Sequence, residues 1–161
     1  MFFKGVRVEI RAMGYSLSQF KAVLDGLGYN LGPNGYGGNH GNTLDFYTQA
    51  AIQEFQLENE LPTTGMLDHQ TLEKARQLVR NLKHSLNLAT DAQLPMNEFY
   101  GPRTLQAVMK FQKMHNLPVT GISGATVRQK LDAEVKKQLQ QQSSNVPQSL
   151  ESFGLEADQV G

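Results

Sequence analysis

The chain has 161 residues, of which 39% are hydrophobic and 19% are charged, and its 15 basic and 15 acidic residues cancel. A neutral chain lacks the general attraction for phosphate on which most nucleic-acid-binding proteins depend, so we expect no nucleic-acid partner. With no cysteine, the chain can form neither disulfides nor thiolate metal sites.

The first predicted element is an N-terminal arm, residues 1–15, in which Val6, Val8 and Ile10 alternate with charged residues. Alternation of this kind is typical of a short strand or an extended arm. The charges also occupy the place where a signal peptide would have its apolar stretch, which predicts a cytoplasmic protein. No apolar run reaches the roughly 18 residues of a membrane helix, so we expect no membrane insertion.

A helix and a long loop are expected next. Ser16 and Gln19 have the spacing of a capping box, and the helix that they begin should stop at Gly28. The following segment, Gly28 to Asp45, is rich in glycine and asparagine and is long for a compact domain, so it is either functional or mobile. The apolar face of the predicted helix consists of Leu17, Phe20, Val23, Leu24 and Leu27.

The next segment is written twice. Residues 48–65 return as residues 104–121, with each matched position 104 − 48 = 56 places later and no gap. Both copies have apolar residues at helical spacing, followed by Leu-Pro and then glycine, so each predicts an amphipathic helix that ends in a turn. The matched apolar residues are Ala51, Ile52 and Phe55 in the first copy and Ala107, Val108 and Phe111 in the second.

Longer helices follow each copy. Asp68 is a candidate N-cap for a helix to about Leu88 that serves both units, and a final helix carries Val127, Leu131 and Val135. From about Gln140 the chain has too few apolar residues to offset the entropy of ordering, which predicts a mobile tail.

These elements predict an all-α fold of two tandem three-helix units that share a long central helix, with a short extended arm before them and a flexible tail after them. The predicted divisions are 1–15 for the arm, 16–76 for unit one, 77–139 for unit two and 140–161 for the tail.

No catalytic constellation is visible. The four histidines lack metal-ligand spacing, the loop glycines lack the ending of a phosphate-binding loop, and the serines have no base nearby. We therefore expect a non-enzymatic protein without metal or cofactor. Gln56 and Gln112, the most regular polar pair of the repeat, are interpreted as structural amides that bond nearby loop backbone.

The repeated unit resembles the small three-helix peptidoglycan-binding domain found on bacterial and phage cell-wall hydrolases. The resemblance rests on Ala-Ile/Val, Phe-Gln, Leu-Pro and Gly at fixed spacing, twice, and spans about Ser16 to Leu131. Unit one keeps Leu-Gly-Tyr at residues 27–29 but has lost Gly-Pro before Thr48. Unit two keeps Tyr-Gly-Pro-Arg-Thr at residues 100–104 but has lost Leu-Gly-Tyr.

The resemblance implies an all-α binding module for cell-wall glycopeptide, which would place the protein at the cell envelope. Its ligand would be held by aromatic faces, amides and an arginine around a shallow cleft. The alternative is that the tyrosines are half-buried rings over the cores and the asparagines serve turns. A second function is also open, an intracellular protein-interaction or scaffold protein that has repurposed the fold. The candidate ligand-binding residues are Tyr29, Asn34 and Tyr36 in unit one and Asn97, Tyr100 and Arg103 in unit two.

Overall fold

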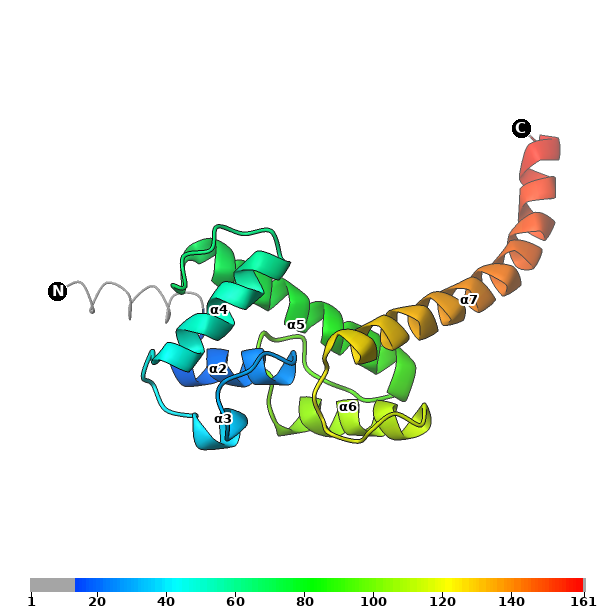
Figure 1. Ribbon diagram of the computed structural model, residues 1–161. Helices are drawn as coiled ribbons and strands as arrows, with labels where there is room; N and C mark the ends of the chain where they lie inside the picture. The colour runs from blue at the N-terminus through cyan, green and yellow to red at the C-terminus, as the bar shows by residue number, and fades with distance from the viewer. Residues whose placement is uncertain (1–13, 161) are drawn as a thin grey trace.

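The computed structural model describes the backbone of residues 14–160 and the side chains up to residue 143. Over this range helices are the only regular secondary structure and no strand is present, which confirms the predicted all-α class (Figure 1). The expected extended arm falls on residues 1–15, of which 1–13 lie outside the described part. The helices are α2 (Leu17–Gly26), α3 (Gly35–Gly38), α4 (Phe46–Glu58), α5 (His69–Thr90), α6 (Pro102–Met114) and α7 (Ala125–Val160).

The sequence repeat is also a structural repeat. Helices α4 and α6 both have 13 residues, and their first residues, Phe46 and Pro102, are 102 − 46 = 56 positions apart. The starts of α5 and α7 have the same offset, since 125 − 69 = 56. Phe55 and Phe111 are both fully buried, so the matched aromatic residues occupy equivalent places of the two units within one continuous core.

The matched glutamines fasten each repeated helix to the turn that follows it. Gln56 accepts a hydrogen bond at Oε1 from the backbone N–H of Gly65 at 2.9 Å, and Gln112 accepts one from Gly121 at the same distance. Each Nε2 group donates to a threonine hydroxyl and to a backbone carbonyl of the same turn. Because both amides are buried, these bonds satisfy polar groups that water cannot reach. The prediction of a structural role for both residues is confirmed.

The two units share α5 and also contact each other directly. Helix α5 packs against α6 and α7 of unit two, and its Thr71 hydroxyl accepts a 2.8 Å hydrogen bond from Gln56 Nε2 on α4 of unit one. The end of α2 meets the second unit at Gly26, whose carbonyl accepts a 2.6 Å hydrogen bond from the backbone N–H of Ser123. The ring of Tyr100 covers Gly26 so closely that a Cβ atom there would lie 2.5 Å from it. The Tyr100 hydroxyl donates to the carbonyl of Gly121 at 2.7 Å.

The final helix is longer than the sequence analysis predicted. The backbone of α7 is helical through Val160, and the mobility expected from residue 140 onward stays a prediction. Figure 1 shows the C-terminal part of α7 extending away from the other helices. The early part of α7, where Leu131 is buried, packs against α5.

The core assignment predicts the cost of shortening Phe111. Replacing a buried phenylalanine by alanine removes its transfer free energy and leaves a cavity, so Phe111→Ala should lower the free energy of unfolding by about 3–5 kcal/mol. Met114, on the same helix, is 52% exposed, and Met114→Ala should stay within about 0.5 kcal/mol of wild type. Denaturant titration of both variants measures this, and equal losses would contradict the assignment.

The close contact at Gly26 gives a second prediction. Because an added methyl group would overlap the buried Tyr100 ring, Gly26→Ala should destabilise the protein by about 1–3 kcal/mol. At Gly41 an added Cβ atom would meet no other atom within 4 Å, so Gly41→Ala serves as the matched control. Thermal melts that rank the two substitutions in the opposite order would show that the units do not meet at Gly26.

Candidate functional site

The loop between α2 and α4 is fastened along α2. Ser18 donates from its backbone N–H to Asn42 Oδ1 at 3.0 Å and from its hydroxyl to the carbonyl of His40 at 2.6 Å. The hydroxyl groups of Ser18 and Tyr36 are 3.3 Å apart. These bonds, together with the short helix α3, hold the segment that we expected to be either functional or mobile. The loop therefore has a defined conformation in this structure.

A buried lysine on α2 is hydrogen-bonded to the same loop. Lys21, on α2, is fully buried, and its Nζ donates to Asn39 Oδ1 at 3.0 Å. Asn39 in turn donates to the carbonyl of Leu31 at 3.0 Å. A buried ammonium group is costly unless it is hydrogen-bonded or near a negative charge, and Asp45 is close enough for Lys21 to affect its ionisation. Lys21 thus joins α2, the loop and the start of α4.

Asp45 forms the N-cap of α4. Its Oδ1 accepts hydrogen bonds from the backbone N–H and the hydroxyl of Thr48, both at 2.8 Å. Burial alone would raise the pKa of Asp45, but the bonds from Thr48 and the charge of Lys21 lower it below its ordinary value. Asp45 therefore supplies the helix cap. In unit two Gly101 precedes α6 without a side-chain cap, and Pro102 occupies the first turn.

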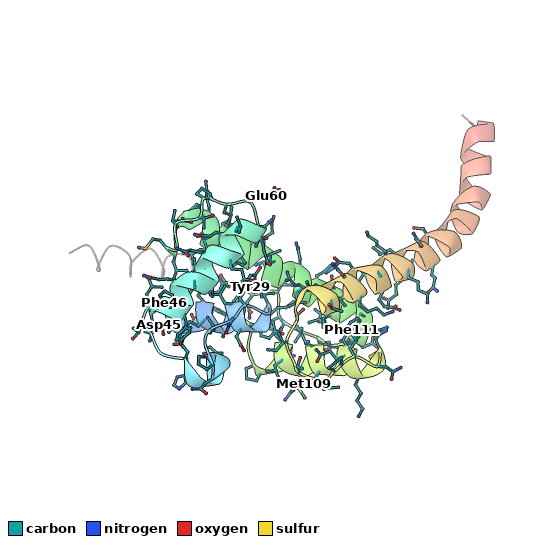
Figure 2. The ribbon with its side chains drawn as sticks, in the orientation of Figure 1. Tyr29, Asp45, Phe46, Glu60, Met109 and Phe111 are labelled. Carbon is teal, nitrogen blue, oxygen red and sulfur yellow. The ribbon has the colours of Figure 1, made fainter. Side chains whose placement is uncertain are left out.

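An exposed aromatic pair stands at the same end of α4. Phe46 is 78% exposed and Tyr47 is 47% exposed, and Figure 2 shows Phe46 beside Asp45 at the start of this helix. The two ring centroids are 6.0 Å apart, with the planes at 76°. A Cβ atom on Gly32 would lie 3.2 Å from the Tyr47 ring, so the loop and the ring are in contact. Sequence reasoning missed this pair, although two adjacent aromatic residues at a helix start were visible.

The three unit-one residues that the sequence singled out have different environments. Tyr29 is 6% exposed, packs edge-on against Phe55 and donates its hydroxyl to Glu58 Oε2. Burial and the neighbouring Glu58 carboxylate raise the pKa of Tyr29. The ring is therefore part of the core, as the alternative interpretation holds. Tyr36 is half-buried beside Ser18, and Asn34 is exposed at the start of α3.

The three unit-two residues that the sequence singled out also differ in burial and in hydrogen-bond partners. Tyr100 is buried at the contact between the units, and burial raises its pKa. Asn97 accepts a hydrogen bond from Lys83 Nζ and one from the backbone N–H of Phe99 at 3.1 Å. Arg103 is exposed and donates to the carbonyl of Gln93 at 2.7 Å. Of these three residues Arg103 is exposed, Asn97 is partly exposed and Tyr100 is buried.

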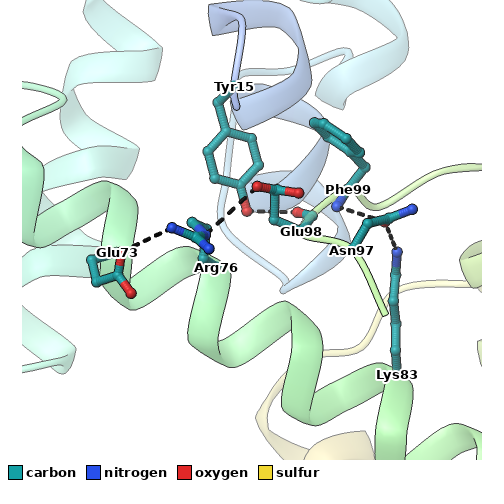
Figure 3. A network of polar contacts seen from close by, with 7 residues as sticks. All are labelled: Tyr15, Glu73, Arg76, Lys83, Asn97, Glu98 and Phe99. Atoms are coloured by element: carbon teal, nitrogen blue, oxygen red, sulfur yellow. Dashed lines mark hydrogen bonds and ion pairs between the residues drawn. The ribbon is translucent and has the colours of Figure 1, made fainter. Parts of the chain in front are cut away.

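A polar network links α5 to the segment before α6 (Figure 3). Arg76 on α5 pairs with Glu73 at 3.2 Å and with Glu98 at 3.6 Å, and Tyr15 donates its hydroxyl to the carbonyl of Glu98 at 2.6 Å. Lys83 is nearly fully buried on the same helix. Burial is the main cause that lowers the pKa of Lys83 to about 8, opposed by the Glu98 carboxylate and assisted by Arg103. The network joins α5 to the segment before α6, and its Glu73 end is exposed to solvent.

The described residues contain no cluster of three or more histidine, aspartate or glutamate side chains able to hold a metal ion. Within the same part of the chain, no helix has the length and apolar character needed to span a membrane.

Comparison with known proteins gives one family match in two copies. The family model described as "Putative peptidoglycan binding domain" matches residues 14–74 and again residues 75–131. No curated protein and no solved structure matches the chain. The two matches cover most of the chain and meet inside α5, in agreement with the shared helix.

The buried Lys83 predicts how stability changes with pH. Its pKa is about 8 in the folded protein and 10.5 ordinarily, so between these values the unfolded chain binds more protons and the free energy of unfolding rises with pH. Denaturant midpoints should therefore increase from pH 8 to 9, a range in which tyrosines of the unfolded chain, with an ordinary pKa of 10.0, remain mostly protonated. Lys83→Met should remove this increase, and an unchanged pH profile in the variant would contradict the assignment.

Proposed function

Because the chain belongs to the peptidoglycan-binding domain family, we propose that it is a non-catalytic binding protein for the glycopeptide of the bacterial cell wall. The observation that carries the proposal is that both family units are complete as helical folds, including the glutamine contacts that shape their turns. Such a role places the protein at the cell envelope and requires no metal or cofactor.

The surface that we assign to the glycan is the start of α4 together with the loop beside it. Carbohydrate rings stack on aromatic faces, and Phe46 and Tyr47 present such faces to solvent. The exposed Asn34 amide supplies a hydrogen-bonding group of the kind that orients a ligand. Exposed aromatic residues that are held by a fastened loop are already arranged for binding, so little ordering entropy opposes association.

Arg103 is the corresponding candidate in unit two. Its bond to the carbonyl of Gln93 holds the guanidinium at the surface, where it can pair with a carboxylate of the wall. Tyr100 does not accompany it, because that ring is buried against Gly26. The proposal therefore takes its aromatic contribution from unit one and its charged contribution from unit two.

A protein-interaction or scaffold role is the second candidate. It is favoured by exposed apolar side chains on unit two, where Leu105, Met114 and Val119 are 39%, 52% and 48% exposed, and by the projecting part of α7 (Figure 1). Exposed apolar groups of this kind mark protein contacts when they lie together.

Co-sedimentation with purified bacterial sacculi tests the wall-binding proposal. Wild-type protein should sediment with the sacculi, and the double variant Phe46→Ala with Tyr47→Ala should bind at least about tenfold more weakly, because stacking would bury both rings. Leu57→Ala is the matched control, since Leu57 is 70% exposed on the same helix. It should bind like wild type.

Two results would overturn the proposal. The first is that wild-type protein stays in the supernatant, which would leave the protein-interaction role. The second is that Leu57→Ala weakens sedimentation as much as the aromatic double variant, which would show that the loss is not specific to Phe46 and Tyr47. Circular dichroism spectra of all variants establish that they remain folded.

A further inference from the structure

The two repeated helices carry opposite charge. Residues 46–67, which comprise α4 and the turn after it, contain acidic side chains but no lysine or arginine. Residues 102–123, which comprise α6 and its turn, contain basic side chains but no aspartate or glutamate. Equivalent parts of the two units therefore have complementary charge. The acidic residues of the first segment are Glu54, Glu58 and Glu60, and the basic residues of the second are Arg103, Lys110 and Lys113.

Two of the carboxylates on α4 lie beside an exposed leucine. Leu57 is 70% exposed, and Glu54 and Glu58 are exposed as well. Residues three and four apart on a helix are neighbours on its surface, so these three side chains form one patch, defined as the acidic face. Glu58 also accepts the hydroxyl of Tyr29 at Oε2, which holds its carboxylate in place.

The same three positions of α6 form a basic face, which consists of Lys110, Lys113 and Met114. Each lies 56 positions after its counterpart, since 110 − 54, 113 − 57 and 114 − 58 are all 56. Both lysines are exposed, and Met114 is 52% exposed. Lys110 Nζ donates to the carbonyl of Thr90 at 3.0 Å, which holds this ammonium group. Each face thus combines an apolar side chain with two charges of one sign.

The two faces of one chain do not meet. Helix α4 packs on α2, whereas α6 packs on α5, and Figure 1 shows the two repeated helices apart from each other. Among the described side chains, the ion pairs within 4 Å join Arg76 to Glu73 and to Glu98. The charges of both faces are therefore open to a partner outside the chain.

We propose that the acidic face of one copy docks on the basic face of a second copy. Leu57 and Met114 form the apolar part of the contact, and the glutamates of one helix pair with the lysines of the other. Two like faces would bring equal charges together, so the pattern selects the unlike face. Because every chain carries one face of each sign, association is head to tail and either closes into a ring or grows as an open chain.

The contact gives the protein-interaction role a specific partner and does not depend on wall binding. Exposed ion pairs contribute little individually, so the association should be weak. It should also weaken with salt, because screening shortens the range of exposed charges. In dilute protein the faces are mostly unoccupied, and Leu57→Ala remains a valid control in the sacculus assay.

Analytical ultracentrifugation of the full-length chain tests the inference. At protein concentrations up to about 1 mM, which detects even weak association, the average mass should rise with concentration. The apparent Kd should be at least about tenfold lower at about 0.02 M salt than at about 0.5 M.

The repeat supplies test substitutions that the fold already accepts at equivalent places. Glu54→Lys with Leu57→Lys gives α4 the residues of α6, and Lys110→Glu with Lys113→Leu gives α6 the residues of α4. Each double variant then has like charges on both helices, so each should associate at least about tenfold more weakly than wild type.

A matched control and a mixture separate the contact from general charge effects. Lys136→Glu with Lys137→Leu makes the same charge change as the α6 variant, at exposed positions of α7, and should associate like wild type. The α4 variant keeps the basic face, and the α6 variant keeps the acidic face. An equimolar mixture of these two should therefore regain association, in complexes that contain both. Circular dichroism establishes folding, and the salt dependence of wild type keeps the test valid if a variant does not fold.

The inference is overturned if wild-type protein stays monomeric up to about 1 mM at low salt, if the mixture does not associate, or if the α7 control loses as much association as the α6 variant. Failure of the proposed function is distinguishable from these outcomes. Protein that self-associates but does not sediment with sacculi supports the contact and refutes wall binding. Protein that sediments but stays monomeric refutes the contact alone.

Discussion

The structure depends on one helix that completes the hydrophobic core of both units. Helix α5 has 22 residues and is therefore about 33 Å long, enough to reach from the first repeated helix to the second. The two family matches change over between residues 74 and 75, within the first third of this helix, and the predicted division at 76/77 also falls inside the helix. The buried side chains of α5 include Leu72, Ala75, Val79, Leu82, Leu86 and Ala89.

Much of this architecture was predictable because its signals are local. Asp68, predicted as an N-cap, accepts hydrogen bonds from Thr71 at the start of α5. The 56-residue offset transfers both ends of α4 to α6 and the start of α5 to the start of α7. Burial of the tyrosines was not predictable in this way. Tyr100 is buried by Gly26, which is 100 − 26 = 74 residues earlier in the sequence, and no pattern within one helix reports a contact between segments so far apart.

The burial of two lysines was also not predictable from local sequence patterns. Lys21 and Lys83 have no sequence feature that separates them from surface lysines, since a lysine is normally exposed. Each is buried because a loop with an asparagine folds over it, Asn39 over Lys21 and Asn97 over Lys83. Asn97 was predicted as a ligand contact for its chemistry, and the same chemistry serves an internal partner. The residue type shows that a polar side chain needs a hydrogen-bond partner. Only the fold shows whether that partner is another residue of the chain.

Both copies keep the same turn after the repeated helix although the residues in it differ. Glu60 and Asn116 occupy the same repeat position with φ of 58° and 57°, although glutamate has no side-chain preference for that conformation. The turn is held instead by the hydrogen bonds from Leu61 to Gln56 and from Leu117 to Gln112, both 2.8 Å between backbone atoms. A scaffold fixed by such contacts tolerates large changes elsewhere. It accommodates exposed aromatic residues at the start of α4 and, on α7, Arg128 at the repeat position of the core residue Leu72, so one fold used twice presents two chemically different surfaces.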